Sequence, residues 1–101
     1  MEAYRSRFEN KEFDDLFDTI LQLETREECY RFFEDLCTIP ELKSIAQRWA
    51  VARELAKGET YQDISARTKA SSATISRVNR CLTYGGTGGY RIMLERLEEK
   101  K

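Results

Sequence analysis

The chain has 101 residues, of which 41% are apolar and 35% are charged, and its formal net charge is −1. These values are typical of one soluble domain, residues 1–101. Neither a membrane span of roughly 20 apolar residues nor the apolar core of a signal peptide occurs, so we expect a cytoplasmic protein. Because histidine is absent and no phosphate-binding glycine motif or metal-ligand spacing is found, we predict no enzyme, no catalytic residue and no metal.

The three cysteines do not have the spacing of a metal site or a disulfide framework. Cys29, Cys37 and Cys81 are odd in number and form no C-x-x-C pair. Each lies among apolar residues of a predicted helix, so we expect buried, reduced thiols.

The first third of the chain predicts two helices that are rich in apolar residues. Asn10 can cap the first, and Thr25 with Glu28 forms a capping box for the second. Their combined apolar surface exceeds what a monomer of this length covers easily, so we expect a second subunit to bury part of it. A well-packed monomer is the alternative. The apolar positions are Phe13, Leu16, Phe17, Ile20, Leu21, Leu23, Cys29, Tyr30, Phe32, Phe33, Leu36 and Cys37.

The longest predicted helix begins around Pro40, the only proline, and ends at Gly58. Thr38 and Glu41 have capping-box spacing at its start. We expect this helix to carry the helices that follow, and residues 10–58 to form the dimerisation core. Its apolar stripe consists of Leu42, Ile45, Ala46, Trp49, Ala52 and Leu55.

Residues 60–83 predict a helix-turn-helix. Thr60 can cap the first helix, and the second helix has its start signal at Ser71 or Ser72. Apolar or small residues stand where two steeply crossing helices meet, and the second helix keeps a polar, cationic outer face. The residues at the crossing are Ile64, Ser65, Ala70, Ile75 and Val78, with Leu82 continuing the inward stripe.

The charge distribution favours nucleic acid as the partner of this motif. Residues 61–84 carry four basic side chains and one acidic one, a net of +3, whereas residues 1–60 carry nine basic and fourteen acidic ones, a net of −5. Arginine and lysine can bind phosphates, and serine and threonine near a helix start can reach base edges in a major groove. The alternative is a solvated helix face in an all-α core. The predicted DNA-binding residues are Arg67, Lys69, Ser71, Ser72, Ala73, Thr74, Ser76, Arg77 and Arg80.

The last part of the chain has four glycines within residues 85–89, followed by an apolar helical pattern. Such a glycine content is typical of a flexible break. We therefore predict a short break and then a final helix over residues 90–99, with Ile92, Met93 and Leu97 inward.

The segment from Leu36 to about Leu97 resembles the Trp repressor family, and most of all its Trp-repressor-like branch in Gram-positive bacteria. The similarity is carried by L-C-T-I-P-E at 36–41, I-A-Q-R at 45–48, E-L-A-K-G-E at 54–59 and A-T-I-S-R at 73–77. The resemblance implies an all-α protomer of six helices that forms an intertwined homodimer through its N-terminal helices. It also implies two recognition helices in successive major grooves of double-stranded DNA, about 34 Å apart.

The resemblance further implies a small-ligand pocket that includes Thr38, Arg48 and Arg77. Val78 and Cys81 stand where the repressor has the glycine and the serine that accommodate tryptophan. A branched side chain at 78 would occupy the space of the indole, so we do not expect tryptophan as the corepressor and predict no required cofactor. The alternative is that Arg48 and Arg77 contact phosphates or solvent with no ligand.

Taken together, the sequence predicts a sequence-specific DNA-binding regulator, with repression favoured over activation. A different class of function remains as the alternative: a helical interaction module that docks on a transcription or replication protein, which would suit the acidic overall balance. Salt-dependent, sequence-dependent DNA binding would separate the two.

Overall fold

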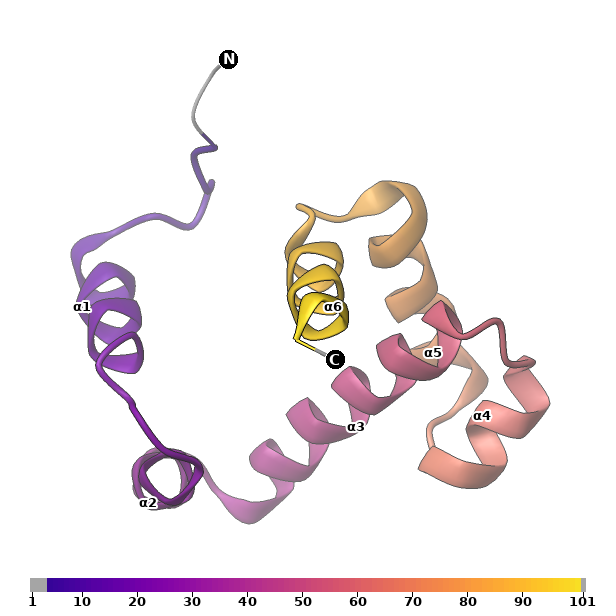
Figure 1. The fold of residues 1–101 in the computed structure, drawn as a ribbon, viewed down its shortest axis with the longest axis horizontal. Helices are drawn as coiled ribbons and strands as arrows, with labels where there is room; N and C mark the ends of the chain where they lie inside the picture. The colour runs from indigo at the N-terminus through magenta and orange to yellow at the C-terminus, as the bar shows by residue number, and fades with distance from the viewer. Residues whose placement is uncertain (1–3, 101) are drawn as a thin grey trace. The chain divides into compact units, whose positions relative to one another are not determined.

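The computed structural model describes residues 4–100. Within them the chain forms α-helices and no strand, and none of these helices is long and apolar enough to cross a membrane. The six helices are α1 (Lys11–Ile20), α2 (Arg26–Leu36), α3 (Ile39–Ala56), α4 (Tyr61–Thr68), α5 (Ser72–Arg80) and α6 (Gly89–Glu99), with a π-helical turn at Cys81–Gly85 (Figure 1). The all-α prediction is confirmed. The chain divides into two compact units between Thr38 and Ile39, so α3 groups with the helix-turn-helix.

The helices of the N-terminal unit begin at the predicted caps. The Asn10 Oδ1 accepts a hydrogen bond from the backbone N–H of Phe13 at 2.9 Å, and the Thr25 Oγ1 accepts one from Glu28 at 3.0 Å. The Glu28 carboxylate accepts the N–H of Glu24, one residue before the cap, at 2.8 Å. The capping box at α2 therefore extends one residue beyond the predicted pair.

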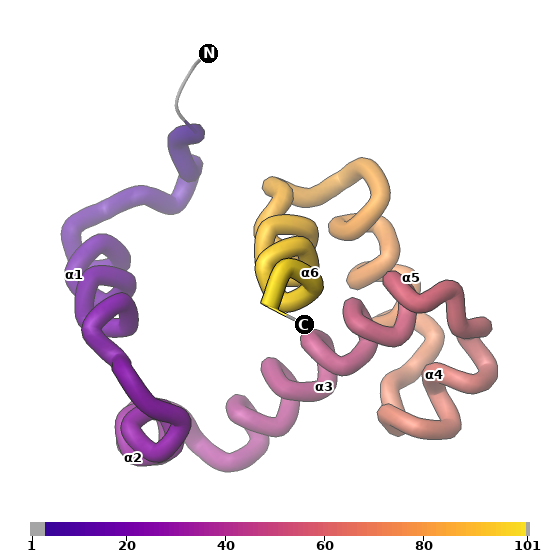
Figure 2. The backbone as a smooth tube through the Cα atoms, viewed as in Figure 1, coloured from indigo at the N-terminus to yellow at the C-terminus, as the bar shows by residue number. Residues whose placement is uncertain are grey.

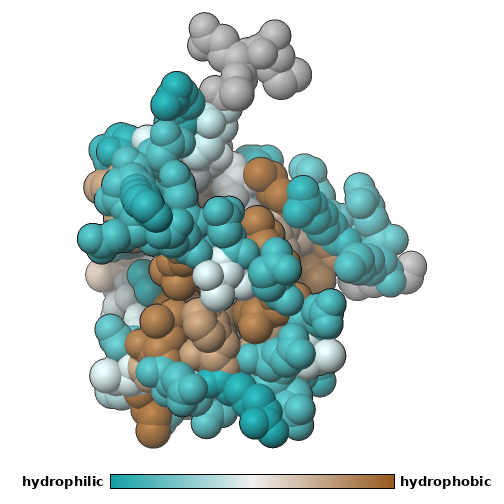
Figure 3. Space-filling model, turned by 90° about the vertical axis from the view of Figure 1, so that its left-hand side faces the viewer, coloured by the Kyte–Doolittle hydropathy of each residue, from teal (hydrophilic) through white to brown (hydrophobic). Residues whose placement is uncertain are grey.

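The apolar side chains of α1 and α2 remain largely exposed. Neither helix contains a buried residue. Phe17 is 54% exposed, Leu21 is 77% exposed and Tyr30 is 64% exposed. Figure 3 shows apolar side chains gathered among hydrophilic ones on the face that it presents. Such large exposed apolar side chains are typical of a surface that another molecule covers.

All three cysteines are free thiols. The prediction that they are buried is wrong for Cys29, which is exposed, while Cys37 and Cys81 are only partly buried. The apolar pattern identified the helix that contains Cys29, but that helix buries none of its residues. Among the described residues no group of histidine, cysteine or acidic side chains could hold a metal ion.

The 18-residue helix α3 forms the base of the C-terminal unit. Val51 and Ala52 are fully buried on it, whereas Ile45 is 47% exposed. The predicted apolar stripe did not include Val51. This residue is buried because α4 and α5 cross α3 near its C-terminal end and cover the residues there. Gly58 adopts a left-handed φ of 82° and ends the helix, as predicted.

The buried core of the described residues lies where α3, α4 and α5 meet. Around it, Trp49 of α3 stacks on Tyr90 of α6, with ring centroids 6.2 Å apart and an interplanar angle of 15°. Figure 2 shows the chain turning back after α5, so that α6 returns towards α3. The core residues, each 2% exposed or less, are Val51, Ala52, Ile64, Ala70, Ile75 and Val78.

The glycine-rich segment is more structured than the composition predicts. Gly85 belongs to the π-helical turn and Gly89 begins α6, so only three residues separate the two elements. A Cβ atom on Gly86 would collide with the backbone carbonyl oxygen of Cys81. The glycine at 86 therefore permits a close backbone approach, which is a specific structural role rather than a source of flexibility.

Candidate nucleic-acid interface

The helix-turn-helix begins with well-formed caps. The Thr60 Oγ1 accepts the N–H of Asp63 at 3.1 Å, and the Ser71 Oγ accepts the N–H of Thr74 at 3.1 Å. Ser71, rather than Ser72, is thus the N-cap of α5. Asp63 also lies in the first turn of α4, where a negative charge interacts favourably with the helix dipole.

The turn between the two helices passes through a left-handed residue. Lys69 has φ 66° and ψ 11°, and it is the one non-glycine residue with positive φ among residues 4–100. Its backbone N–H donates to the carbonyl of Ser65 at 2.9 Å, and its Nζ donates to the carbonyl of Ala66 at 3.1 Å. Lysine therefore holds a left-handed conformation that glycine adopts at lower cost.

Side-chain hydrogen bonds hold this turn in place. The Ser65 Oγ donates to the carbonyl of Ala70 at 2.9 Å, and the Thr68 Oγ1 accepts the N–H of Ala70 at 3.2 Å. From α3, the Gln47 Nε2 donates to the carbonyl of Thr68 at 3.1 Å. These bonds satisfy polar groups around the buried Ala70 and fix the angle at which α5 leaves α4.

Replacing Lys69 by glycine is expected to raise the free energy of unfolding by about 0.5–1 kcal/mol, because a left-handed backbone costs a side-chain-bearing residue about 1–2 kcal/mol. Urea denaturation followed by circular dichroism measures the change. Lys43→Gly, an exposed position inside α3, is the matched control and should lower stability by about 1 kcal/mol. A similar loss in both variants would contradict the strain at Lys69.

The outer face of α5 carries most of the predicted DNA-binding residues. Ile75 and Val78 point into the core, so the residues between them face outward. Thr74 is half-buried, and its hydroxyl lies 3.1 Å from the Ser71 Oγ within the cap. The exposed members of the predicted set on this face are Ser71, Ser72, Ala73, Ser76, Arg77 and Arg80.

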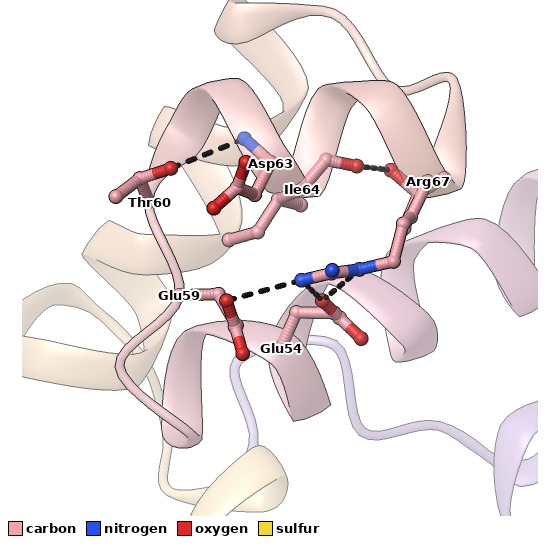
Figure 4. Close-up of polar contacts among 7 residues, drawn as sticks. Glu54, Glu59, Thr60, Asp63, Ile64 and Arg67 are labelled. Atoms are coloured by element: carbon pink, nitrogen blue, oxygen red, sulfur yellow. Dashed lines mark hydrogen bonds and ion pairs between the residues drawn. The ribbon is translucent and has the colours of Figure 1, made fainter.

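The four predicted phosphate-binding cations differ in their surroundings. Arg77 and Arg80 are exposed, and neither guanidinium makes an ion pair with another residue of 4–100. The guanidinium of Arg67, by contrast, contacts the carboxylates of Glu54 and Glu59 (Figure 4). Sequence reasoning missed these partners, which precede Arg67 by 13 and 8 positions.

The same contacts raise the pKa of Arg67 above its ordinary value, chiefly through the hydrogen bond with Glu54 and then that with Glu59. A raised pKa on a basic group stabilises the folded protein below the unfolded-state pKa, and this contribution is lost only as the pH rises through the folded-state pKa. Arg67 therefore stays charged and paired throughout the neutral range.

The residues of the predicted ligand pocket are divided between the two units. Thr38 belongs to the N-terminal unit, and Arg48 and Arg77 belong to the C-terminal one. The Arg48 Nε donates to the carbonyl of Ser44, one turn earlier on α3, at 3.4 Å. Val78 is part of the buried core, and Cys81 begins the π-helical turn.

Comparison with known proteins gives the family. The sequence profile described as Trp repressor protein matches residues 11–98, which is most of the chain. The chain belongs to the Trp repressor family. The family match includes both α1–α2 and the helix-turn-helix.

Relatives within the Trp repressor family cover nearly the whole chain. The uncharacterised protein YerC of Bacillus subtilis is 55% identical over 93 residues, which are 92% of this chain and 88% of YerC. A crystal structure of a candidate Trp repressor from Staphylococcus aureus is 47% identical, with a TM-score of 0.86 over 91% of each chain. A TrpR like protein from Eubacterium eligens is 48% identical, with a TM-score of 0.86 over 91% of this chain and 94% of that one.

Proposed function

We propose that this protein is a sequence-specific DNA-binding regulator that acts as a helix-turn-helix homodimer and represses transcription. The observation that carries the proposal is the two-sided character of α5. Ile75 and Val78 anchor the helix in the core, and serine and arginine side chains cover its exposed side. Membership of the Trp repressor family supports the same function.

In the proposed complex the residues of the motif have two roles. Ser71, Ser72, Ala73, Thr74 and Ser76 lie at or near the start of α5, where side chains can reach base edges in the major groove. Lys69, Arg77 and Arg80 bind phosphates, which supply affinity and fix the position of the protein on the duplex. No cofactor is part of this proposal, and tryptophan is not proposed as a ligand because Val78 is a core residue.

The homodimer part of the proposal is supported by α1 and α2. Both helices begin at well-formed caps, but neither buries a residue. Their exposed aromatic and leucine side chains would be covered by a second copy. Such a dimer presents two copies of α5 to one face of the DNA, and repression would follow from occupying a promoter.

Selection of bound fragments from genomic DNA, followed by mobility-shift titrations at several salt concentrations, tests this function. Specific, salt-steep binding to an inverted-repeat sequence is the expected result. A protein that docks on a transcription or replication component would show no such binding, and that outcome would replace the proposal with the interaction-module alternative.

Replacing Arg80 by alanine is expected to reduce the slope of log K against log salt by about one, because one phosphate contact is lost. Mobility-shift titration on the selected operator measures the slope. Arg31→Ala removes the same charge from α2, where Arg31 pairs with Glu27 at 3.7 Å, and should leave the slope unchanged. An unchanged slope for Arg80→Ala would remove Arg80 from the proposed phosphate contacts.

A further inference from the structure

Arg67 joins three segments of the C-terminal unit through a three-residue ion-pair cluster, which we call the corner clasp (Arg67, Glu54 and Glu59). The Arg67 Nε and Nη2 lie 2.9 and 2.6 Å from the Glu54 Oε1, and Nη2 also lies 3.1 Å from the Glu59 Oε2. Figure 4 shows the guanidinium pointing from α4 towards the end of α3, between the two carboxylates.

The clasp spans the corner between α3 and α4. Glu54 lies in the last turn of α3, Glu59 follows the left-handed Gly58, and Arg67 lies in the last turn of α4. The carboxylate of Glu54 near the negative end of the α3 dipole is unfavourable by itself, and the cation of Arg67 offsets this repulsion. A single side chain thus holds the end of α3, the connecting loop and the end of α4 together.

The position of Arg67 on α4 links the clasp to the core. Ile64, three residues earlier and therefore on a neighbouring part of the helix surface, is fully buried. Ile64 attaches α4 to the core, and the clasp adds a directional contact beside it. The backbone turn at Lys69 follows two residues after Arg67, so a rotation of α4 about this attachment would be passed directly to α5.

The charge of the clasp argues against phosphate binding by Arg67. One guanidinium faces two carboxylates, so the cluster has a net charge of −1, and an approaching phosphate would meet repulsion. Glu54 is also only 20% exposed at its side chain, so the pair that it forms is better shielded from solvent than an ordinary surface pair. Arg77 and Arg80, which have no carboxylate partner among residues 4–100, are free of this competition.

We propose that Arg67 is a positioning residue that fixes the helix-turn-helix on the end of α3 and is not a phosphate ligand. Its role in DNA recognition rests on the proposed function, but its structural role does not. The role of Arg67 is to set the orientation of α4, and through the turn that of α5, relative to the longest helix of the unit.

Two measurements on the full-length protein test the inference. Hydrogen exchange without DNA is expected to be about threefold faster in the α4 amides of Arg67→Ala and of the double variant Glu54→Gln/Glu59→Gln, and unchanged in Arg80→Ala. In mobility-shift titrations, Arg67→Ala should bind the operator about threefold more weakly at every salt concentration, with the slope of the wild-type protein. Arg80→Ala, the matched control, should lose about one unit of slope.

The outcomes separate this inference from the proposed function. Normal α4 exchange in Arg67→Ala, or a loss of one unit of salt slope, would overturn the positioning role. If the wild-type protein binds no DNA, the proposed function fails, and the exchange measurement alone still decides whether Arg67 and its two carboxylates hold α4. Combining Arg67→Ala with the double glutamine variant should add no further increase in exchange, because one shared interaction is removed.

Discussion

Replacing Ile75 by alanine is expected to lower the free energy of unfolding by about 3–4 kcal/mol, the largest effect that we predict for a single substitution. Ile75 is fully buried and contributes to the point where α5 meets α3 and α4. Truncation removes apolar contacts and leaves a cavity that the neighbouring helices can fill only in part. Urea denaturation followed by circular dichroism measures the loss.

The next residue provides the control for Ile75. Ser76 is exposed on the same helix, so Ser76→Ala should change stability by no more than about 0.5 kcal/mol. Ile75→Val, which removes one methylene group, should cost about 1 kcal/mol. Equal losses in the free energy of unfolding for Ile75→Ala and Ser76→Ala would show that α5 does not bury the side that carries Ile75. The assignment of outward-facing residues on α5, on which the proposed interface depends, would then be wrong.

Replacing Gly86 by alanine is expected to lower the free energy of unfolding by about 3 kcal/mol, because the new methyl group would meet backbone atoms of Cys81 that cannot move independently. The change would also displace α6. Trp49 is the only tryptophan of the chain and stacks on Tyr90 at the beginning of α6, so its fluorescence reports on the displacement. A shift in Trp49 emission should accompany the loss of stability.

Gly89→Ala is the matched control for Gly86→Ala. A Cβ atom on Gly89 meets no atom within 4 Å, and the residue begins α6. Alanine there should be neutral or stabilise the protein by up to about 1 kcal/mol, with unchanged Trp49 emission. If the two alanine variants behave alike, the close approach at Gly86 has no energetic consequence.

The sequence was sufficient to predict the helices, because their signals are local. A cap bonds to the backbone three residues ahead, so Asn10, Thr25 and Thr60 could be identified without any tertiary information. For α5 the sequence left Ser71 and Ser72 as alternatives, and the structure shows that Ser71 is the cap. The inward positions Ile75 and Val78 were predicted for the same reason, since helical periodicity places both on one side.

The features that the sequence did not predict depend on contacts between distant residues. The core role of Val51 depends on where α4 and α5 cross α3, and the partners of Arg67 depend on how the chain turns at Gly58. A count of charges identified the excess of cations in the motif but not which cation is already paired. The π-helical turn was missed because the glycines at and after its end are equally typical of a loop, and only the closeness of Gly86 to Cys81 distinguishes the two.

The absence of buried residues in α1 and α2 has a consequence for how this half of the chain folds. The helices have 10 and 11 residues, and helices of this length are marginal in water when only their own hydrogen bonds stabilise them. In the proposed dimer, ordering of the N-terminal third would therefore be coupled to association. Dilution would then melt these helices before it affects α3 to α6, and the cellular abundance of the protein would set how much of it is folded along its full length.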